Sequence, residues 1–276
     1  MSRVLLLTGA SSGIGYAAAH DFHRRGWRVF ATCRKEADVE RLREEGLESL
    51  VLDVADEDSC ARAVDEVLER SGGRIDALVN NAAFACPGLV EDLPRGALRD
   101  VLETNLIGQI DLTRRVLPAM RAQGHGRIVM ISSILGFVAL RGRGAYISSK
   151  FALEGITDTL RLELADEPLD VILIEPGPIT SEIRRKARGP FERWIDWEAS
   201  ARRSFYETDL RPRLYKEPPP PDPSELPADA VTRKLEHALE ARRPHPRYFV
   251  TRPTYIANVA RRVLSTRLLD RILVRA

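Results

Sequence analysis

Cysteine is scarce in this chain, and its spacing excludes several classes of protein. The sequence contains three cysteines, Cys33, Cys60 and Cys86, which are widely separated and odd in number. No pair has the CxxC spacing of a zinc or redox site, and an odd, scattered set does not indicate a disulfide framework. The cysteine content therefore favours a protein of the reducing cytoplasm.

A strong excess of one charge and a long apolar run are also missing. The chain has 42 lysines and arginines against 40 acidic residues, so no global field selects nucleic acid or acidic membrane as a partner. The N-terminal apolar run Val4–Leu7 ends at Thr8, too early for the apolar core of a signal peptide. We interpret this run as a buried strand of a globular protein.

The histidines do not form a recognisable metal site. The chain has five, and only His20 and His23 have a spacing that could place two ligands near each other. No carboxylate cluster accompanies that pair. We therefore expect structural roles for the histidines and no bound metal.

Short leucine-rich or β-branched runs alternate with longer amphipathic stretches from Arg3 to about Glu175, as in repeated βαβ units. The predicted strands are Val4–Thr8, Arg28–Thr32, Glu48–Leu52, Ala77–Asn80, Arg127–Ser132, Val171–Glu175 and Arg247–Val250. The predicted helices are Gly13–Arg25, Ala37–Glu45, Glu57–Arg70, Arg95–Ala122, Ala145–Ala165 and Pro227–Ala241. This order predicts an α/β fold in one domain, residues 1–276: a Rossmann-type, doubly wound parallel sheet of about seven strands with helices on both faces.

The segment after the sixth predicted strand has a different composition. Residues 182–223 are dense in arginine and aromatic residues and end in a proline-rich stretch. We expect a helical, mobile substrate lid here, because the segment follows a predicted cofactor loop and its prolines interrupt regular structure. The prolines could instead form a domain linker, although too little sequence follows them to bury an independent core. The aromatic residues could line an apolar substrate pocket or anchor the lid: Trp194, Trp197, Phe205 and Tyr206.

The C-terminal stretch, residues 254–276, reads as an amphipathic basic helix. Apolar positions such as Ile256, Val259 and Val263 alternate with arginines such as Arg261 and Arg262. The helix could dock on the domain or on a partner subunit, or it could lie on a membrane surface. It cannot span a membrane, because a spanning helix needs about twenty mainly apolar residues in succession.

A glycine-rich turn joins the first predicted strand to the first predicted helix. Small residues at this position let the backbone turn sharply and bring helix N–H groups close to a pyrophosphate. The alternative is a tight turn in which glycine serves only the backbone angles. The predicted cofactor contacts of this turn, which has the sequence TGASSGIG from Thr8, are Gly9, Ser11, Ser12, Gly13, Ile14 and Gly15.

The residues after the second predicted strand favour NADP as the cofactor. A carboxylate there would bind the adenosine ribose hydroxyls and repel a 2′-phosphate, but this chain has Cys33-Arg34-Lys35. Arg34 can hold a phosphate through two parallel hydrogen bonds, with Ser11 or Ser12 as neutral donors. The alternative is an ordinary solvated Arg-Lys pair.

Tyr146, Lys150 and Ser133 form the predicted catalytic group. Tyr146 and Lys150 are four residues apart on a predicted helix, so their side chains leave the same face. An ammonium group beside a phenol lowers the pKa of the phenol, which makes proton exchange with a carbonyl feasible near neutral pH. Ser133 closes a predicted strand at the carboxyl edge, where parallel sheets bind ligands, and its hydroxyl can hydrogen-bond the reacting oxygen.

Over residues 3–181 the chain resembles the short-chain dehydrogenase/reductase family. Beyond the glycine-rich turn, the matching motifs are Asp53-Val54, Asn80-Asn81-Ala82-Ala83, Asn105, Ile131-Ser132-Ser133, Tyr146-x-x-x-Lys150 and Pro176-Gly177-Pro178-Ile179. Within the family, Thr-Cys-Arg after the second strand, Ile-Glu-Pro-Gly-Pro and the long C-terminal part are similar to the branch acting on retinoids, hydroxysteroids and lipophilic aldehydes.

The resemblance implies roles for individual residues. Asp53 and Val54 hold the adenine edge and Asn80 lines the ribose path. The loop from Pro176 and Gly177 leads to Ile179 and Ser181, which flank the nicotinamide. The implied catalytic tetrad is Asn105, Ser133, Tyr146 and Lys150, with Asn105 fixing a water that passes protons to Lys150.

Two positions depart from the family pattern. The usual Asn-Asn-Ala-Gly ends in Ala83, and the threonine common in the later loop is Ser181. Ala83 has less backbone freedom than glycine, and Ser181 keeps a hydroxyl. These changes bear on cofactor affinity and leave the chemical groups in place.

The combined prediction is an NADP-dependent oxidoreductase that transfers a hydride between nicotinamide and a lipophilic carbonyl or alcohol substrate. The rival is a non-catalytic protein that senses the NADP redox state, because a fold alone does not define a function. A sensor does not need Ser133, Tyr146 and Lys150 together. We expect a small-molecule substrate, no nucleic acid, a cytoplasmic location with possible peripheral membrane contact, and, from the family resemblance, a homo-oligomer.

Overall fold

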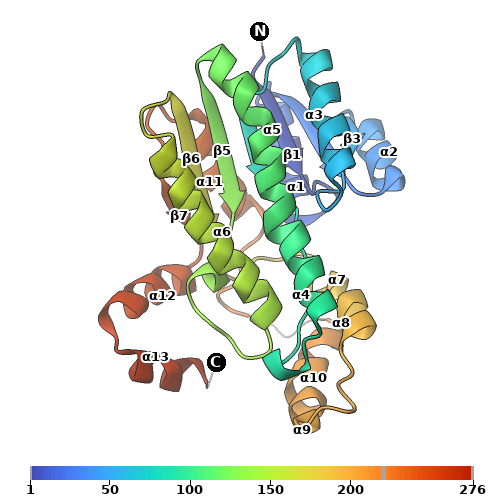
Figure 1. Cartoon of the computed structure of the whole chain (residues 1–276), viewed down its shortest axis with the longest axis vertical. Coiled ribbons are helices and arrows are strands. Elements are labelled where there is room, and N and C mark those ends of the chain that lie inside the picture. Colours follow the sequence, from blue (N-terminus) through green and yellow to red (C-terminus); the bar gives the residue numbers. More distant parts are fainter. Residues whose placement is uncertain (1, 219–221, 275–276) are drawn as a thin grey trace.

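The computed structural model describes residues 2–218 and 222–274. At its centre is a parallel sheet of seven strands, in the order β3-β2-β1-β4-β5-β6-β7 (Figure 1). The strands are β1 (Val4–Thr8), β2 (Arg28–Cys33), β3 (Glu48–Val51), β4 (Ala77–Asn80), β5 (Gly126–Ile131), β6 (Leu169–Glu175) and β7 (Arg247–Phe249). The predicted Rossmann-type sheet is confirmed, and the strand order reverses between β1 and β4, where such sheets bind ligands.

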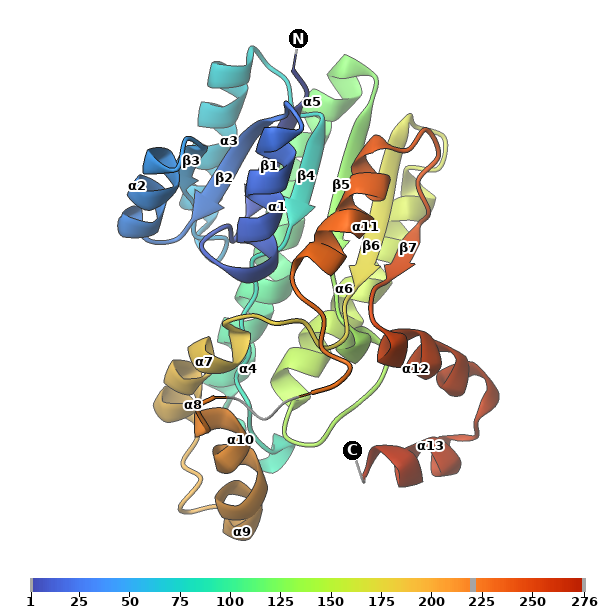
Figure 2. The same ribbon diagram turned by 180° about the vertical axis from the view of Figure 1, so that it is seen from behind.

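Helices cover both faces of the sheet, which explains why its strands are almost continuously apolar. Figure 2 shows one face, covered by α1 (Gly13–Arg24) and α11 (Asp229–Glu240), with α2 (Glu36–Glu44) at the edge. The opposite face carries α3 (Glu57–Ser71), α5 (Gly108–Gln123) and α6 (Gly144–Glu163). Alternate residues of β1 divide between these layers: Leu5 and Leu7 pack in one buried cluster, and Leu6 packs in the other.

One predicted helix is interrupted in the structure. The amphipathic pattern predicted a single helix over Arg95–Ala122, but the chain forms α4 (Arg95–Leu102), the π-helical turn η2 (Glu103–Ile107) and α5. The turn lets Gly108 approach the Val54 carbonyl so closely that a Cβ would lie 1.7 Å from its oxygen. It also contains Asn105, and π-turns inside helices often occur at functional sites.

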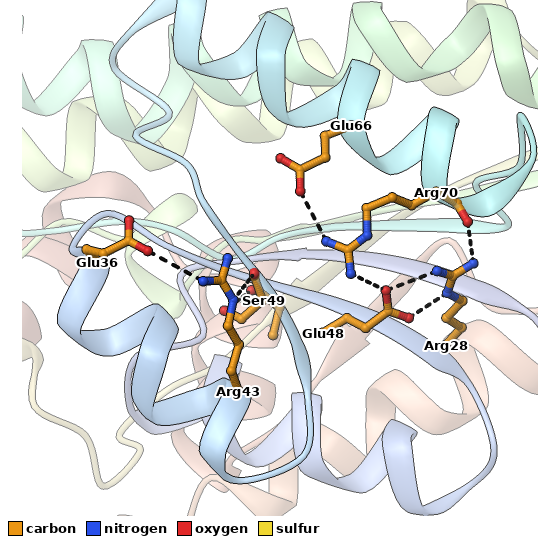
Figure 3. A network of polar contacts seen from close by, with 8 residues as sticks. Arg28, Glu36, Arg43, Glu48, Ser49, Glu66 and Arg70 are labelled. Atoms are coloured by element: carbon orange, nitrogen blue, oxygen red, sulfur yellow. Dashed lines mark hydrogen bonds and ion pairs between the residues drawn. The ribbon is translucent and has the colours of Figure 1, made fainter.

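The edge strand β3 is held by charged side chains (Figure 3). Glu48 accepts hydrogen bonds from Arg28 on β2 and Arg70 on α3. On the same strand, the Ser49 carbonyl accepts a hydrogen bond of 3.1 Å from Arg43 on α2. These contacts tie the outer strand to β2 and to the two helices, α2 and α3, that flank it.

The segment expected to be the lid is mostly helical. It contains α7 (Ile183–Lys186), α8 (Arg188–Trp194), α9 (Arg203–Phe205), the π-helical η4 (Tyr206–Leu210) and α10 (Arg211–Tyr215). Its buried residues Phe191, Tyr206 and Leu214 share an apolar cluster with the region after β4 and with α4. The four aromatic residues singled out above all belong to this cluster, so they anchor the segment. Residues 219–221, within the predicted lid, lie outside the described part of the chain.

Two 3₁₀ turns follow strands of the sheet: η1 (Val90–Asp92) comes after β4, and η3 (Ile134–Gly136) comes after β5. The chain ends in a C-terminal arm, formed by α12 (Arg252–Val263) and α13 (Thr266–Leu273), which projects from the body in both views (Figures 1 and 2).

The C-terminal arm is attached through α12. Tyr255 packs against Phe249 with ring centroids 5.5 Å apart, and the Arg261 guanidinium lies over the Phe151 ring of α6. In contrast, α13 has no buried residue, so it does not dock on its own domain. Within the described residues no helix is both long enough and apolar enough to cross a membrane, and residues 275 and 276 lie outside that range.

Candidate active site

The glycine-rich turn after β1 is shaped for close approach by a ligand. Gly9 and Gly13 have positive φ angles of 70° and 59°, and a Cβ on Gly15 would lie 2.3 Å from the Gly9 carbonyl oxygen. The Asn81 amide donates to the carbonyls of Thr8 and Gly9 at 2.9 and 3.1 Å and so fixes the turn. The turn leads into the N-terminus of α1, and Ile14 packs on the core below it. This cradle fits a pyrophosphate.

Two basic side chains other than the predicted Arg34 reach the serines of the turn. Lys186 of α7 donates to the Ser12 hydroxyl at 2.7 Å and to the Ser11 hydroxyl at 3.3 Å. Arg41 of α2 donates to the Ser11 carbonyl at 2.9 Å. Arg34 is exposed after β2 and has no hydrogen bond or ion pair with the described residues. Its guanidinium is therefore available to a ligand.

The three residues predicted to contact the adenosine part of the cofactor, Asp53, Val54 and Asn80, differ in how deeply their side chains are buried. Asp53 is half-buried and accepts a hydrogen bond from the Ala55 amide, and Val54 is buried. Asn80 is fully buried and donates to Thr113 of α5 at 2.9 Å. Because its side chain faces away from the glycine-rich turn, any contact of Asn80 with a ribose has to come from its backbone.

The loop after β6 closes the other side of the cradle. The Pro176 carbonyl accepts a hydrogen bond from the Ile134 amide at 2.7 Å, which ties this loop to η3. A Cβ on Gly177 would lie 2.1 Å from the Thr251 hydroxyl oxygen, so only glycine fits there. Ile179 forms an isolated parallel β-bridge with Leu226. The Cβ atom of Ser181 lies 3.4 Å from the position that a Cβ on Gly13 would occupy, so this loop contacts the glycine-rich turn.

Ser133, Tyr146 and Lys150 come together at the carboxyl end of β5. The Ser133 side chain hydrogen-bonds the Tyr146 hydroxyl, and the Lys150 ammonium lies 5.7 Å from the centroid of the Tyr146 ring. Lys150 is almost fully buried and donates to the Ile131 carbonyl at 2.7 Å. These three predicted residues therefore occupy one site.

The pKa of Tyr146 differs from the expectation. Burial raises it to about 12, and the hydrogen bond from Ser133 and the positive charge of Arg143 work against that rise. Burial also lowers the pKa of Lys150 to about 8.

Asn105 reaches the site from the π-turn η2. Its side-chain oxygen accepts from the Phe84 amide at 3.0 Å, and its nitrogen donates to the Phe84 carbonyl and to the Ser149 hydroxyl. Ser149 is the residue before Lys150 on α6. Asn105 thus connects the segment after β4 to the helix that carries Tyr146 and Lys150.

An ion cluster lies behind Lys150. Arg247 of β7 donates to Glu154, Glu175 and Asp158. Glu154 is one helical turn after Lys150, and its charge opposes the fall in the Lys150 pKa. Burial and the nearby Glu154 carboxylate raise the pKa of Glu175 to about 8.

Sequence reasoning missed four residues at the site. Lys186 contacts the turn serines, Asn81 holds the turn, Arg143 acts on Tyr146, and Arg184 acts on Arg143. Asn81 stands inside a motif that was recognised, whereas the three basic residues had no signal beyond the high arginine content of their segments.

A doubly wound sheet that carries a dinucleotide-type turn and a serine, tyrosine and lysine group at one edge is typical of the nucleotide-dependent oxidoreductases. The sequence model described as short chain dehydrogenase matches residues 3–190, more than half of the chain. The protein belongs to this family.

Named relatives cover nearly the whole chain. The uncharacterized oxidoreductase YbbO of Escherichia coli is 36% identical over 99% of this chain and 94% of its own length. The NADPH-dependent 3-dehydrocapnine reductase of Ornithobacterium rhinotracheale is 32% identical over 98% and 95%. Retinol dehydrogenase 7 of Mus musculus is 34% identical over 89% and 79%.

A solved short-chain dehydrogenase from Streptomyces avermitilis is similar in fold. It superimposes with a TM-score of 0.78 at 27% identity and covers 94% of this chain and 92% of its own. The predicted family, its similarity to retinol dehydrogenases and the predicted fold class are therefore confirmed, and the protein is an oxidoreductase of this family.

Proposed function

We propose that the protein is an NADP-dependent oxidoreductase that interconverts a lipophilic carbonyl compound and its alcohol. The observation that carries the proposal is the meeting of Ser133, Tyr146 and Lys150 at the same carboxyl edge of the sheet as the glycine-rich turn. A protein that only senses the cofactor has no use for this group. One relative, the 3-dehydrocapnine reductase, is named as NADPH-dependent.

The roles of the side chains follow from the contacts. A nicotinamide cofactor held between the glycine-rich turn and the loop after β6 would supply or accept the hydride. The Tyr146 hydroxyl gives a proton to the carbonyl oxygen during reduction and takes it back during oxidation. Ser133 hydrogen-bonds the same oxygen, and Lys150 supplies positive charge behind the tyrosine. Asn105 holds α6 in place through Ser149.

The experiment is a steady-state assay of NADPH oxidation with a panel of aldehydes and ketones, and of NADP reduction with secondary alcohols. Tyr146→Phe should lower kcat at least about a thousandfold while NADPH still binds, because only the transferable proton is lost. Lys150→Ala should weaken both turnover and cofactor binding. A Tyr146→Phe enzyme with normal turnover would refute these roles.

The proposed preference for NADP over NAD rests on the positive side chains near the expected position of the 2′-phosphate. Arg34 has no partner among the residues that the structure describes, and Lys186 and Arg41 hold the neighbouring serines, while Cys33 stands where a carboxylate would favour NAD. We expect NADP to bind at least about tenfold more tightly than NAD, or about 1.4 kcal/mol. Arg34→Ala should reduce this ratio in a fluorescence titration of both cofactors. Equal affinities in the unaltered protein would exclude the assignment.

The segment of residues 182–223 is proposed to cover the substrate, and the C-terminal arm to rest on a membrane. The exposed fractions of Ile256, Val259 and Val263 are 68%, 57% and 71%, and arginines lie beside them. Contact with the headgroup layer would bring the site near substrates that are scarce in water. One domain, self-association and a cytoplasmic location complete the proposal.

A further inference from the structure

Three arginines gather on the side of the site that faces α7 and α10. Arg143 precedes α6 by one residue and lies three residues before Tyr146, Arg184 belongs to α7, and Arg213 belongs to α10. The pKa of Arg143 is lowered, first by burial and then by the positive charges of Arg184 and Arg213. Arg143 therefore lies within electrostatic reach of both Arg184 and Arg213, and its position at the start of α6, three residues before Tyr146, also lets its charge act on that tyrosine.

Two of these arginines lack a partner among residues 2–218 and 222–274. Arg143 and Arg184 make no side-chain hydrogen bond or ion pair there, and the Arg184 Nη1 atom is buried. Other arginines of the same region are paired: Arg185 with Glu182, and Arg213 with Asp209 at 3.5 Å. Both side chains are half-buried, and a guanidinium that loses water without gaining a partner is costly, to which clustering with like charges adds.

Other basic residues lie at the glycine-rich turn, where the cofactor phosphates would bind. Lys186 and Arg41 meet at Ser11 and Ser12, at the glycine-rich turn. Arg143 instead lies three residues before Tyr146 at the start of α6, and its charge acts on the tyrosine hydroxyl, where the reacting oxygen would lie in the proposed reaction. An anion held by Arg143 and Arg184 is thus next to the reacting carbonyl, on the side of the substrate.

We infer that the substrate carries an anionic oxygen group, a carboxylate, sulfonate or phosphate, beside its reacting carbonyl or alcohol, and that Arg143 and Arg184 bind this group. The inference rests on the proposed function and narrows its substrate class. Planar guanidinium groups suit all three oxyanions, because each presents two oxygens to parallel N–H donors. The negative charge of Asp209 also acts on Arg143, but the Asp209 carboxylate already forms an ion pair with Arg213.

The test compares matched charged and neutral probes. Terephthalaldehydic acid and its methyl ester differ at one position, and formylbenzenesulfonate and formylphenyl phosphate distinguish the oxyanions. The unaltered enzyme should have a kcat/KM for the acid at least about tenfold above that for the ester, since hydrogen bonds to a charged group are worth roughly that factor or more. Added salt should reduce the difference.

Variants assign the effect to residues. Arg143→Gln and Arg184→Gln should each lower the acid-to-ester ratio of kcat/KM about tenfold. The ratio cancels any change in Tyr146 that affects both probes equally. Arg185→Gln, the neighbouring paired arginine of α7, is the matched control and should leave the ratio unchanged.

A binding measurement separates this inference from the proposed function. Calorimetry of the NADPH complex should show benzoate binding at least about tenfold more tightly than benzamide, whether or not any aldehyde is reduced, with the preference lost in Arg184→Gln. Equal binding of benzoate and benzamide, or variants that weaken NADPH without changing the ratio, would overturn the inference. Absence of turnover with a normal preference for benzoate would overturn only the proposed function.

Discussion

The hydroxyl of Tyr206 should be a main anchor of the segment of residues 182–223. Tyr206 is fully buried in η4. Its hydroxyl donates to the Asp92 carboxylate at 2.6 Å and accepts from the Leu89 amide at 2.9 Å. Both partners lie between β4 and α4, so this one oxygen joins two distant parts of the chain.

Tyr206→Phe removes the hydroxyl and leaves the ring in place. The hydrogen bond to a charged carboxylate contributes about 1.5–3 kcal/mol, and an unpaired amide at buried Leu89 costs about 1–3 kcal/mol. Asp92 keeps its hydrogen bond from Ser200 at 2.8 Å, which offsets part of the loss. We therefore expect the free energy of unfolding to fall by about 3 kcal/mol, which corresponds to roughly 6–10 °C in Tm for a chain of this size.

The assay is urea unfolding followed by circular dichroism, with thermal unfolding as a second measurement. Tyr215→Phe is the matched control, because the Tyr215 hydroxyl donates to Glu192 on the exposed side of the same segment. This control should lose less than about 1 kcal/mol. If Tyr206→Phe were no less stable than Tyr215→Phe, the anchoring role of the hydroxyl would be wrong.

Two further predictions concern other parts of the molecule. The pKa of Glu175 is raised to about 8, above its ordinary value, so its contribution to stability is complete below about pH 4.5 and is lost as pH rises to about 8. Glu175→Gln should therefore flatten the fall in unfolding free energy over that range, and an unchanged slope would contradict the assignment. For the C-terminal arm, replacing exposed Leu268 and Ile272 of α13 by serine should abolish flotation with anionic liposomes at low salt. Absence of flotation in the unaltered protein would remove the membrane proposal.

Most of the sheet could be predicted from the sequence, because the periodicity that marks a strand is local. Val4–Thr8 and Ala77–Asn80 have the predicted bounds, and the other strands differ by one or two residues. The glycine-rich turn and the Tyr146–Lys150 pair were readable for the same reason. Each is a short motif whose spacing alone places its side chains on one turn or one helix face.

The interruption at η2 shows where local pattern fails. The apolar spacing around Asn105 suits a continuous helix, and the π-turn arises because Gly108 must pass the Val54 carbonyl while Asn105 bonds Phe84 and Ser149. These partners lie on other elements. Tertiary packing therefore overrode the local preference.

The charges around the site were decided only by the tertiary structure. The sequence predicted a phosphate contact for Arg34, which follows directly from its place after a strand. It could not indicate that Lys186 reaches Ser12 across 174 positions, or that Arg143 lies beside Arg184. Electrostatic interactions depend on distance in space and on burial, and neither is written in the spacing of residues along a chain.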